Sequence, residues 1–204
     1  MYRNILNSIV TLMALAVLAL LVSPPVMGQS KVVLPPKGLS QNQQTLTPAT
    51  SRDPARLRSL LLAIHGFSRQ GLEAATTDVP VLLRQFISDG GESITVRRQA
   101  IKALRFYPTQ DNLGFIQARV GLAPVGLKRL YASTLGRYSG ALQAGASATL
   151  STLVNDGDAG VRHAAIGAVR LLGVNSETRK ALDGRLKVEA DASVRRALSA
   201  ALGD

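Results

Sequence analysis

Residues 156–173 read DGDAGVRHAAIGAVRLLG, the best-formed unit of a pattern that recurs along the chain. An acidic turn that contains glycine leads into Val161 and Arg162, and apolar residues then follow at helical spacing. A similar sequence, DASVRRALSAAL, occupies residues 191–202. Its Val194 follows Val161 by 33 residues. Self-similarity at such a period predicts a repeated structural unit.

The same phase extends toward the N-terminus. The first apolar residue of each unit, taken as offset zero, is Val96, Leu127, Val161 and Val194, at intervals of 31, 34 and 33 residues. At offsets 0, 4, 7 and 8, 15 of the 16 positions are apolar or aromatic, and Thr134 is the exception. This spacing is typical of one face of an α-helix. A weaker unit begins near Arg56.

Shorter apolar segments between these helices are also predicted to be helical. They cover about residues 110–120, 144–154 and 176–188, and two earlier helices are expected from Pro54 to about Phe67 and over residues 77–88. Pairs of helices at this period predict an all-α fold, an α-solenoid of about four to five stacked antiparallel helix pairs.

Two segments resemble a known family. LVNDGDAGVRHAAIGAVRLLG (residues 153–173) and KVEADASVRRALSAAL (residues 187–202) are similar to short HEAT-like repeats of the phycobilisome-lyase type. This resemblance implies that the second helix of each pair lines a concave surface. HEAT-like repeats occur in scaffolds, adaptors, a few lyases and DNA-repair proteins, so the resemblance implies a fold and not an activity.

The N-terminal region predicts export. Residues 1–28 combine Arg3, an apolar run at residues 9–22 and two prolines, which is typical of a signal peptide, and residues 29–51 are expected to form a flexible linker before a repeat domain at 52–204. The alternative is an uncleaved anchor helix, although a run of 14 residues is shorter than the roughly 20 that a span requires. In a bacterium, the folded part would be periplasmic or secreted.

Composition and motifs argue against an enzyme. The chain has no Cys, and the GxSxG, GxxxxGK[ST] and HExxH motifs are all absent. Only two histidines occur, His65 and His163, and no cluster of carboxylates and histidines at ligand spacing surrounds His163. We therefore predict no catalytic residue, no metal site and no cofactor. Asp158 and Asp191 are expected to cap helices.

The basic residues fall into two classes, because successive helical residues turn by about 100°. Offset +1 lies at the edge of the buried face, where a cation can pair with the capping Asp of a neighbouring repeat; these seam residues are Arg97, Lys128, Arg162 and Arg195. Offsets +2 and +9 point away from the core; these candidate partner-binding residues are Arg98, Arg105, Arg129, Arg170 and Arg196.

Taken with the resemblance, the outward arginines predict one basic stripe across several repeats. The net charge of +11 supports an anionic partner. The leading hypothesis is an exported scaffold or interaction module that binds an acidic protein segment or an anionic envelope polymer. A solvated helix face explains the same arginines without a ligand. A lyase-like or enzyme-accessory subunit that shelters a small ligand, and a nucleic-acid binder, are the alternatives, and nucleic acid is disfavoured by the export signal.

Overall fold

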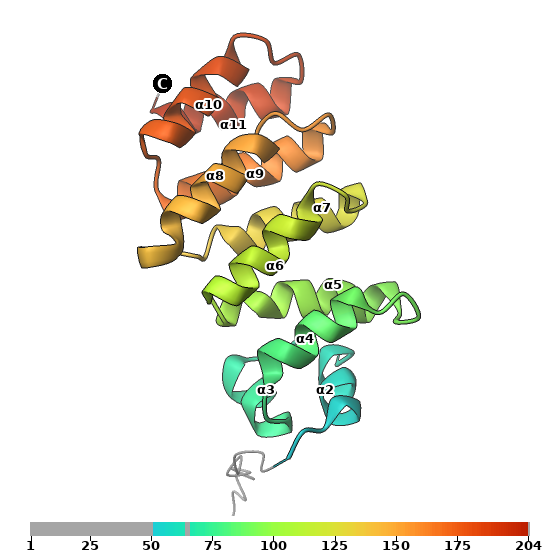
Figure 1. The fold of residues 1–204 in the computed structure, drawn as a ribbon. Coiled ribbons are helices and arrows are strands. Elements are labelled where there is room, and N and C mark those ends of the chain that lie inside the picture. The colour runs from blue at the N-terminus through green and yellow to red at the C-terminus, as the bar shows by residue number, and fades with distance from the viewer. Residues whose placement is uncertain (1–50, 64–65, 204) are drawn as a thin grey trace, which may run out of the picture. The chain divides into compact units, whose positions relative to one another are not determined.

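The computed structural model describes residues 51–63 and 66–203. All regular elements among these residues are helices, so the prediction of an all-α fold is confirmed (Figure 1). The predicted signal segment, residues 29–50 of the predicted linker, and His65 lie outside the described residues.

The elements follow one another in this order: α2 (Pro54–Leu61), α3 (Arg69–Ala75), α4 (Val79–Ser88), α5 (Ile94–Ala103), η1 (Leu104–Phe106), α6 (Gln110–Val120), α7 (Val125–Leu135), η2 (Gly140–Leu142), α8 (Gln143–Leu153), α9 (Ala159–Leu172), α10 (Ser176–Leu186) and α11 (Ala192–Leu202). Within the described part of the chain, none of these helices combines the length and apolar character that a bilayer crossing requires.

The helices of the repeated pattern form where the periodicity predicts them. α5, α7, α9 and α11 each begin two residues before the residue assigned offset zero. The intervening helices α6, α8 and α10 match their expected ranges to within two residues at either end. The expected helix at 77–88 also forms, as α4. The hydrophobic period therefore identifies helix positions well in this chain.

The first helix of the domain is shorter than expected. The pattern predicts a helix from Pro54 to about Phe67, but α2 ends at Leu61, and Gly66 adopts a left-handed φ of 78° that interrupts helical geometry. Ser68 then accepts a hydrogen bond from the amide of Gly71 and begins the unpredicted helix α3. The buried positions of α2 are Leu57 and Leu61, so the register that starts at Arg56 was wrong by one residue.

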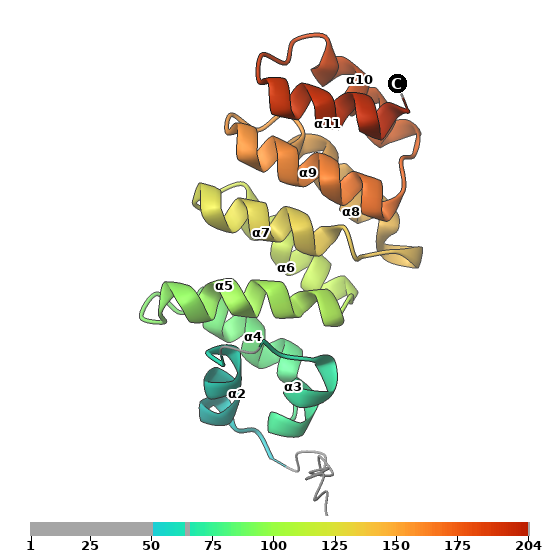
Figure 2. The ribbon, with the colours of Figure 1, turned by 180° about the vertical axis from the view of Figure 1, so that it is seen from behind.

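Helices that are far apart in sequence contact one another in two series. α5 contacts α7, α7 contacts α9 and α9 contacts α11, while α4, α6, α8 and α10 contact one another in the same order. Each member of the second series also contacts the helix that follows it in the chain. In Figure 1, α4, α6, α8 and α10 lie toward the viewer. Figure 2 shows the molecule from the opposite side, where α5, α7, α9 and α11 lie toward the viewer.

The predicted helix faces form the core between these helices. Of the sixteen positions at offsets 0, 4, 7 and 8, all are buried except Ala201 and Leu202, which are partly buried. Thr134, the one polar member, is only 3% exposed, and its hydroxyl donates a hydrogen bond to the carbonyl of Ile101 at 3.1 Å. A buried polar side chain is tolerated here because its hydrogen bond is made inside the protein.

Small residues let α7 and α9 approach closely. Gly136 ends α7 against Ala168 of α9, and a methyl group added at Gly136 would lie 2.9 Å from the Cα atom of Ala168. Backbone atoms cannot move aside as a flexible side chain can, so the spacing of these two helices depends on glycine at this position.

Candidate functional site

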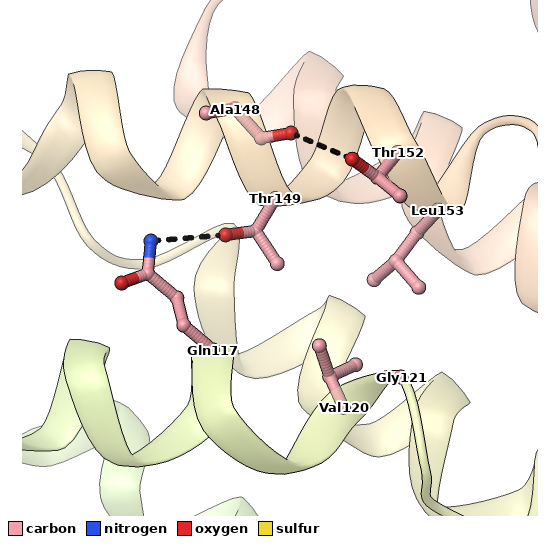
Figure 3. Close-up of a pocket in the computed structure, with 7 residues that line it drawn as sticks. All are labelled: Gln117, Val120, Gly121, Ala148, Thr149, Thr152 and Leu153. Carbon is pink, nitrogen blue, oxygen red and sulfur yellow. Dashed lines mark hydrogen bonds between the residues drawn. The ribbon is translucent and has the colours of Figure 1, made fainter.

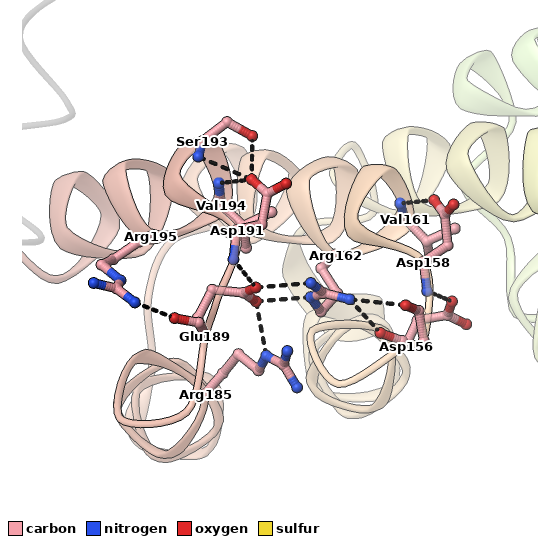
Figure 4. Close-up of polar contacts among 11 residues, drawn as sticks. Asp156, Asp158, Val161, Arg162, Arg185, Glu189, Asp191, Ser193, Val194 and Arg195 are labelled. Atoms are coloured by element: carbon pink, nitrogen blue, oxygen red, sulfur yellow. Dashed lines mark hydrogen bonds and ion pairs between the residues drawn. The ribbon is translucent and has the colours of Figure 1, made fainter.

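A buried network of charged groups joins the two C-terminal helix pairs. The Nε and Nη2 groups of Arg162 donate hydrogen bonds of 2.7 Å to the two carboxylate oxygens of Glu189, and Arg185 donates a third at 2.8 Å (Figure 4). Arg162 is 7% exposed and Glu189 is 2% exposed. The Nη1 group of Arg162 donates hydrogen bonds to the backbone carbonyls of Asp156 and Gly157, both at 3.0 Å. The network therefore satisfies the charges that it buries.

The charges of this network shift the titration of its acids. Hydrogen bonds from Arg162 and then Arg185 hold the pKa of Glu189 far below its ordinary value. Burial alone would raise the pKa of Asp156, but the hydrogen bonds from Lys128 and the Asp158 amide outweigh it and lower that pKa. These carboxylates are held as anions that stabilise the fold, which makes them unsuited to proton transfer at neutral pH.

The seam residues differ in their partners. Lys128 pairs with Asp156 at 2.8 Å, Arg162 pairs with Glu189, and Arg195 donates to the carbonyl of Glu189. The acids that Lys128 and Arg162 bind are loop residues, whereas the expectation was the capping Asp of the next repeat. Arg97 has no such pair among the described residues, and its buried Nε lacks a hydrogen-bond partner.

The capping role of the two aspartates is confirmed. Asp158 accepts a hydrogen bond from the amide of Val161, and Asp191 accepts one from the amide of Val194. Their side chains thus bind backbone groups that would otherwise be unpaired at the starts of α9 and α11.

All five candidate partner-binding residues are exposed: Arg98, Arg105, Arg129, Arg170 and Arg196. Arg129 is partly engaged, because it pairs with Asp158 at 2.8 Å and lies over Gly160, where an added Cβ atom would clash with its guanidinium group. The Arg105 guanidinium lies 4.7 Å from the centre of the Phe106 ring. His163, at the equivalent position of α9, is also exposed.

Three basic side chains, those of Lys102, Arg105 and Arg137, line one cavity. It has a volume of about 280 Å³ and lies over the C-terminal ends of α5 and α7, and Leu171 of α9 also lines it. Its lining is Lys102, Arg105, Leu130, Ser133, Thr134, Arg137 and Leu171. Three of these seven residues are cations and none is an acid.

The lining suits an anionic group attached to an apolar one. Guanidinium and ammonium groups bind carboxylate or phosphate oxygens, and arginine can do so with two parallel hydrogen bonds. Leu171 is 61% exposed, so it offers apolar surface beside the cations. The hydroxyl of Thr134 is already bonded to Ile101, which leaves Ser133 as the exposed hydroxyl of the lining, although it donates to the carbonyl of Arg129 at 3.0 Å.

Of the five predicted outward arginines, the cavity includes only Arg105. Lys102 was missed although offset +6 points away from the core about as directly as offset +9, so helix phase would have found it. Arg137 follows the end of α7 at Leu135, where helix phase no longer applies. Its position depends on the turn after Gly136, which the sequence pattern does not specify.

A second cavity, of about 380 Å³, lies between α6 and α8 (Figure 3). Its lining is Gln117, Val120, Gly121, Ala148, Thr149, Thr152 and Leu153, without a charged side chain. Gln117 donates to the hydroxyl of Thr149 at 3.2 Å, and Thr152 donates to the carbonyl of Ala148 at 3.3 Å. Its polar groups therefore largely bond to one another, and it offers little to fix a ligand.

Among the described residues, no group of three or more His, Asp or Glu side chains is arranged so that it could hold a metal ion.

Comparisons of the chain with protein-family models, with curated proteins and with solved structures found no significant match.

Proposed function

We propose that this chain is an exported, HEAT-like α-solenoid of stacked antiparallel helix pairs that serves as an interaction module, and that the cavity between α5, α7 and α9 binds an acidic segment of a partner protein. The two contact series of helices support the solenoid, because each pair contacts the next in a constant order. The apolar run at residues 9–22 supports export.

The observation that carries the binding proposal is the convergence of Lys102, Arg105 and Arg137 on one cavity whose lining has no acid. Cations repel one another, so on a helix face that only contacts water they would be expected to lie apart and not to gather at one cavity. Leu130 and the exposed Leu171 favour a peptide that carries both acidic and apolar side chains over a uniformly charged polymer.

Fluorescence anisotropy with a fluorescein-labelled peptide of alternating Glu and Leu tests the proposal. A triple variant, Lys102→Glu with Arg105→Glu and Arg137→Glu, should weaken binding by about tenfold or more, since removing a net interaction of about 1.4 kcal/mol suffices for that change. The matched control reverses three exposed cations near α10, Arg179→Glu, Lys180→Glu and Lys187→Glu, and should bind within about threefold of the parent at physiological salt.

Equal loss of affinity in the two triple variants would show that net charge alone attracts the peptide, and would overturn the site. Tighter binding of polyphosphate than of the peptide, lost in the cavity variant, would assign the same cavity to an anionic polymer instead. Retention on double-stranded DNA at physiological salt would favour the nucleic-acid alternative.

A further inference from the structure

A contact between neighbouring helix pairs repeats along the chain. In each case a cation stands one residue after the first buried residue of its helix and reaches an acid in the loop that precedes a later helix. The pairs are Arg58 with Glu92 at 2.8 Å, Lys128 with Asp156 at 2.8 Å, and Arg162 with Glu189 at 2.7 Å. Each acid is less exposed than its cation. The exposed fractions of the Glu92, Asp156 and Glu189 side chains are 8%, 13% and 0%, against 43%, 20% and 8% for their cations. The loop carboxylate is thus the inner member of each pair.

The pair that Arg97 of α5 should make is missing. Asp156 and Glu189 lie five residues before the first buried residues of α9 and α11, and Glu92 lies four residues before that of α5. The equivalent positions before α7 are Leu122 and Ala123. Leu122 is 92% exposed, and the loop at residues 121–124 (GLAP) holds no acid. The Nε of Arg97 is nevertheless buried and has no hydrogen-bond partner among the described residues. A buried donor without an acceptor is costly, and it favours a ligand that supplies one.

A cavity of about 260 Å³ lies at this position. Arg97 and Arg119 both line it, together with apolar side chains that include Leu122, Leu127 and Tyr131, and no acid belongs to its lining. The guanidinium of Arg119 is fixed 3.9 Å from the centre of the Phe115 ring and donates to the hydroxyl of Ser88 at 3.1 Å. The cavity therefore presents two guanidinium groups in an apolar setting.

We propose that this cavity receives an acidic side chain from a partner protein, whose carboxylate takes the place beside Arg97 that Glu189 takes beside Arg162. The carboxylate accepts hydrogen bonds from Arg97 with its charge partly neutralised by Arg119, and an apolar neighbour in the partner contacts Leu122. Residues 1–50 contain neither Asp nor Glu, so a side chain of this chain's own N-terminal segment cannot fill the place. No residue lines both this cavity and the one with Lys102, Arg105 and Arg137, so the two proposals stand independently.

Leu122→Glu tests the proposal from inside the chain, because it places an acid five residues before the first buried residue of α7, where Asp156 and Glu189 stand before α9 and α11. It should raise the melting temperature by about 2–4 °C relative to Leu122→Gln, which has the same shape without the charge. The gain should vanish when Arg97→Gln is added to both, which isolates the pair as a double-mutant cycle. Leu122 is exposed, so these variants are expected to fold. Equal melting temperatures for Leu122→Glu and Leu122→Gln would overturn the inferred carboxylate position.

Binding is followed through the Arg97 Nε–H resonance of the ¹⁵N-labelled protein, assigned by its loss in Arg97→Lys. Titration with the Glu-Leu peptide should shift this resonance in the parent and in Leu122→Gln, and should leave it unmoved in Leu122→Glu, where the site is already filled. Because the readout is local, it separates this site from the cavity that holds Arg105 and Arg137. A resonance that stays fixed in the parent, or that moves equally in Leu122→Glu, would overturn the proposal. So would a dimer that forms without peptide and is lost in Arg97→Gln, since a second copy of the chain would then be the occupant.

Discussion

The guanidinium of Arg162 and the carboxylate of Glu189 are joined by two hydrogen bonds of 2.7 Å, at a point where both side chains are almost completely buried. Arg162 belongs to α9, whereas Glu189 stands in the loop between α10 and α11. The pair therefore connects two successive helix pairs, and Arg185 of α10 completes it with a third hydrogen bond. Arg162 is committed to the fold and is not available to a partner.

Removing the acid of this pair should strongly destabilise the domain. Glu189→Ala leaves Arg162 buried without its counter-ion, and breaking a buried pair from one side costs about 3–5 kcal/mol. Urea denaturation followed by circular dichroism measures the loss. Glu177→Ala removes an exposed acid of α10 and should change the free energy of unfolding by less than about 0.5 kcal/mol. A small effect of Glu189→Ala would show that water enters the network and replaces the carboxylate.

Stability should fall on acidification. The folded-state pKa of Glu189 lies well below its ordinary value of 4.5, because of the hydrogen bonds from Arg162 and Arg185. A depressed pKa contributes stability that is fully present above the unfolded-state pKa and is lost as the pH falls below it toward the folded-state value. Urea midpoints measured from pH 7 to pH 3 should therefore drop mainly below about pH 4.5. The drop should be shallower in Glu189→Gln, and parallel curves would contradict the assignment.

The close approach of α7 and α9 predicts opposite effects of the same substitution at two glycines. Gly136→Ala places a methyl group 2.9 Å from the Cα of Ala168 and should cost about 1–3 kcal/mol, because the helices must separate. At Gly167, inside α9, an added methyl group would have no atom within 4 Å apart from its chain neighbours and the backbone of its own helix. Gly167→Ala should therefore be neutral or stabilising by up to about 1 kcal/mol, since alanine favours helix. Thermal unfolding of both variants compares them directly. Equal effects would show that the helices adjust freely.

Two roles of Asp158 can be separated by substitution. Its side chain caps α9 through the amide of Val161 and also pairs with Arg129. Asp158→Asn keeps a capping oxygen and should cost less than about 1 kcal/mol, whereas Asp158→Ala loses the cap and should cost about 1 kcal/mol more. Chemical denaturation measures both variants. If Asn and Ala were equally destabilising, the charge and not the cap would be the important feature.

Helix positions were predictable because burial leaves a regular mark on the sequence. Val96, Leu127, Val161 and Val194 mark α5, α7, α9 and α11, since each helix must place its apolar side chains on one face. The break between α2 and α3 was not predictable in this way. It depends on the left-handed backbone of Gly66 and on the Ser68 cap, which interrupt a continuous apolar pattern.

The sequence by itself determined the helical class, the phase of the buried faces and the exposure of the outward arginines, because these follow from local periodicity. Tertiary structure alone decided which charges meet. Arg97, Lys128 and Arg162 occupy equivalent helix positions, yet only Lys128 and Arg162 pair with a loop acid among the described residues, whereas Arg97 lines a cavity. Likewise, Lys102, Arg105 and Arg137 converge only through the turn after α7 and the packing of α5 against it. A pairing between residues some 30 positions apart depends on the spacing and the loops of neighbouring helices, and no single helix pattern contains that information.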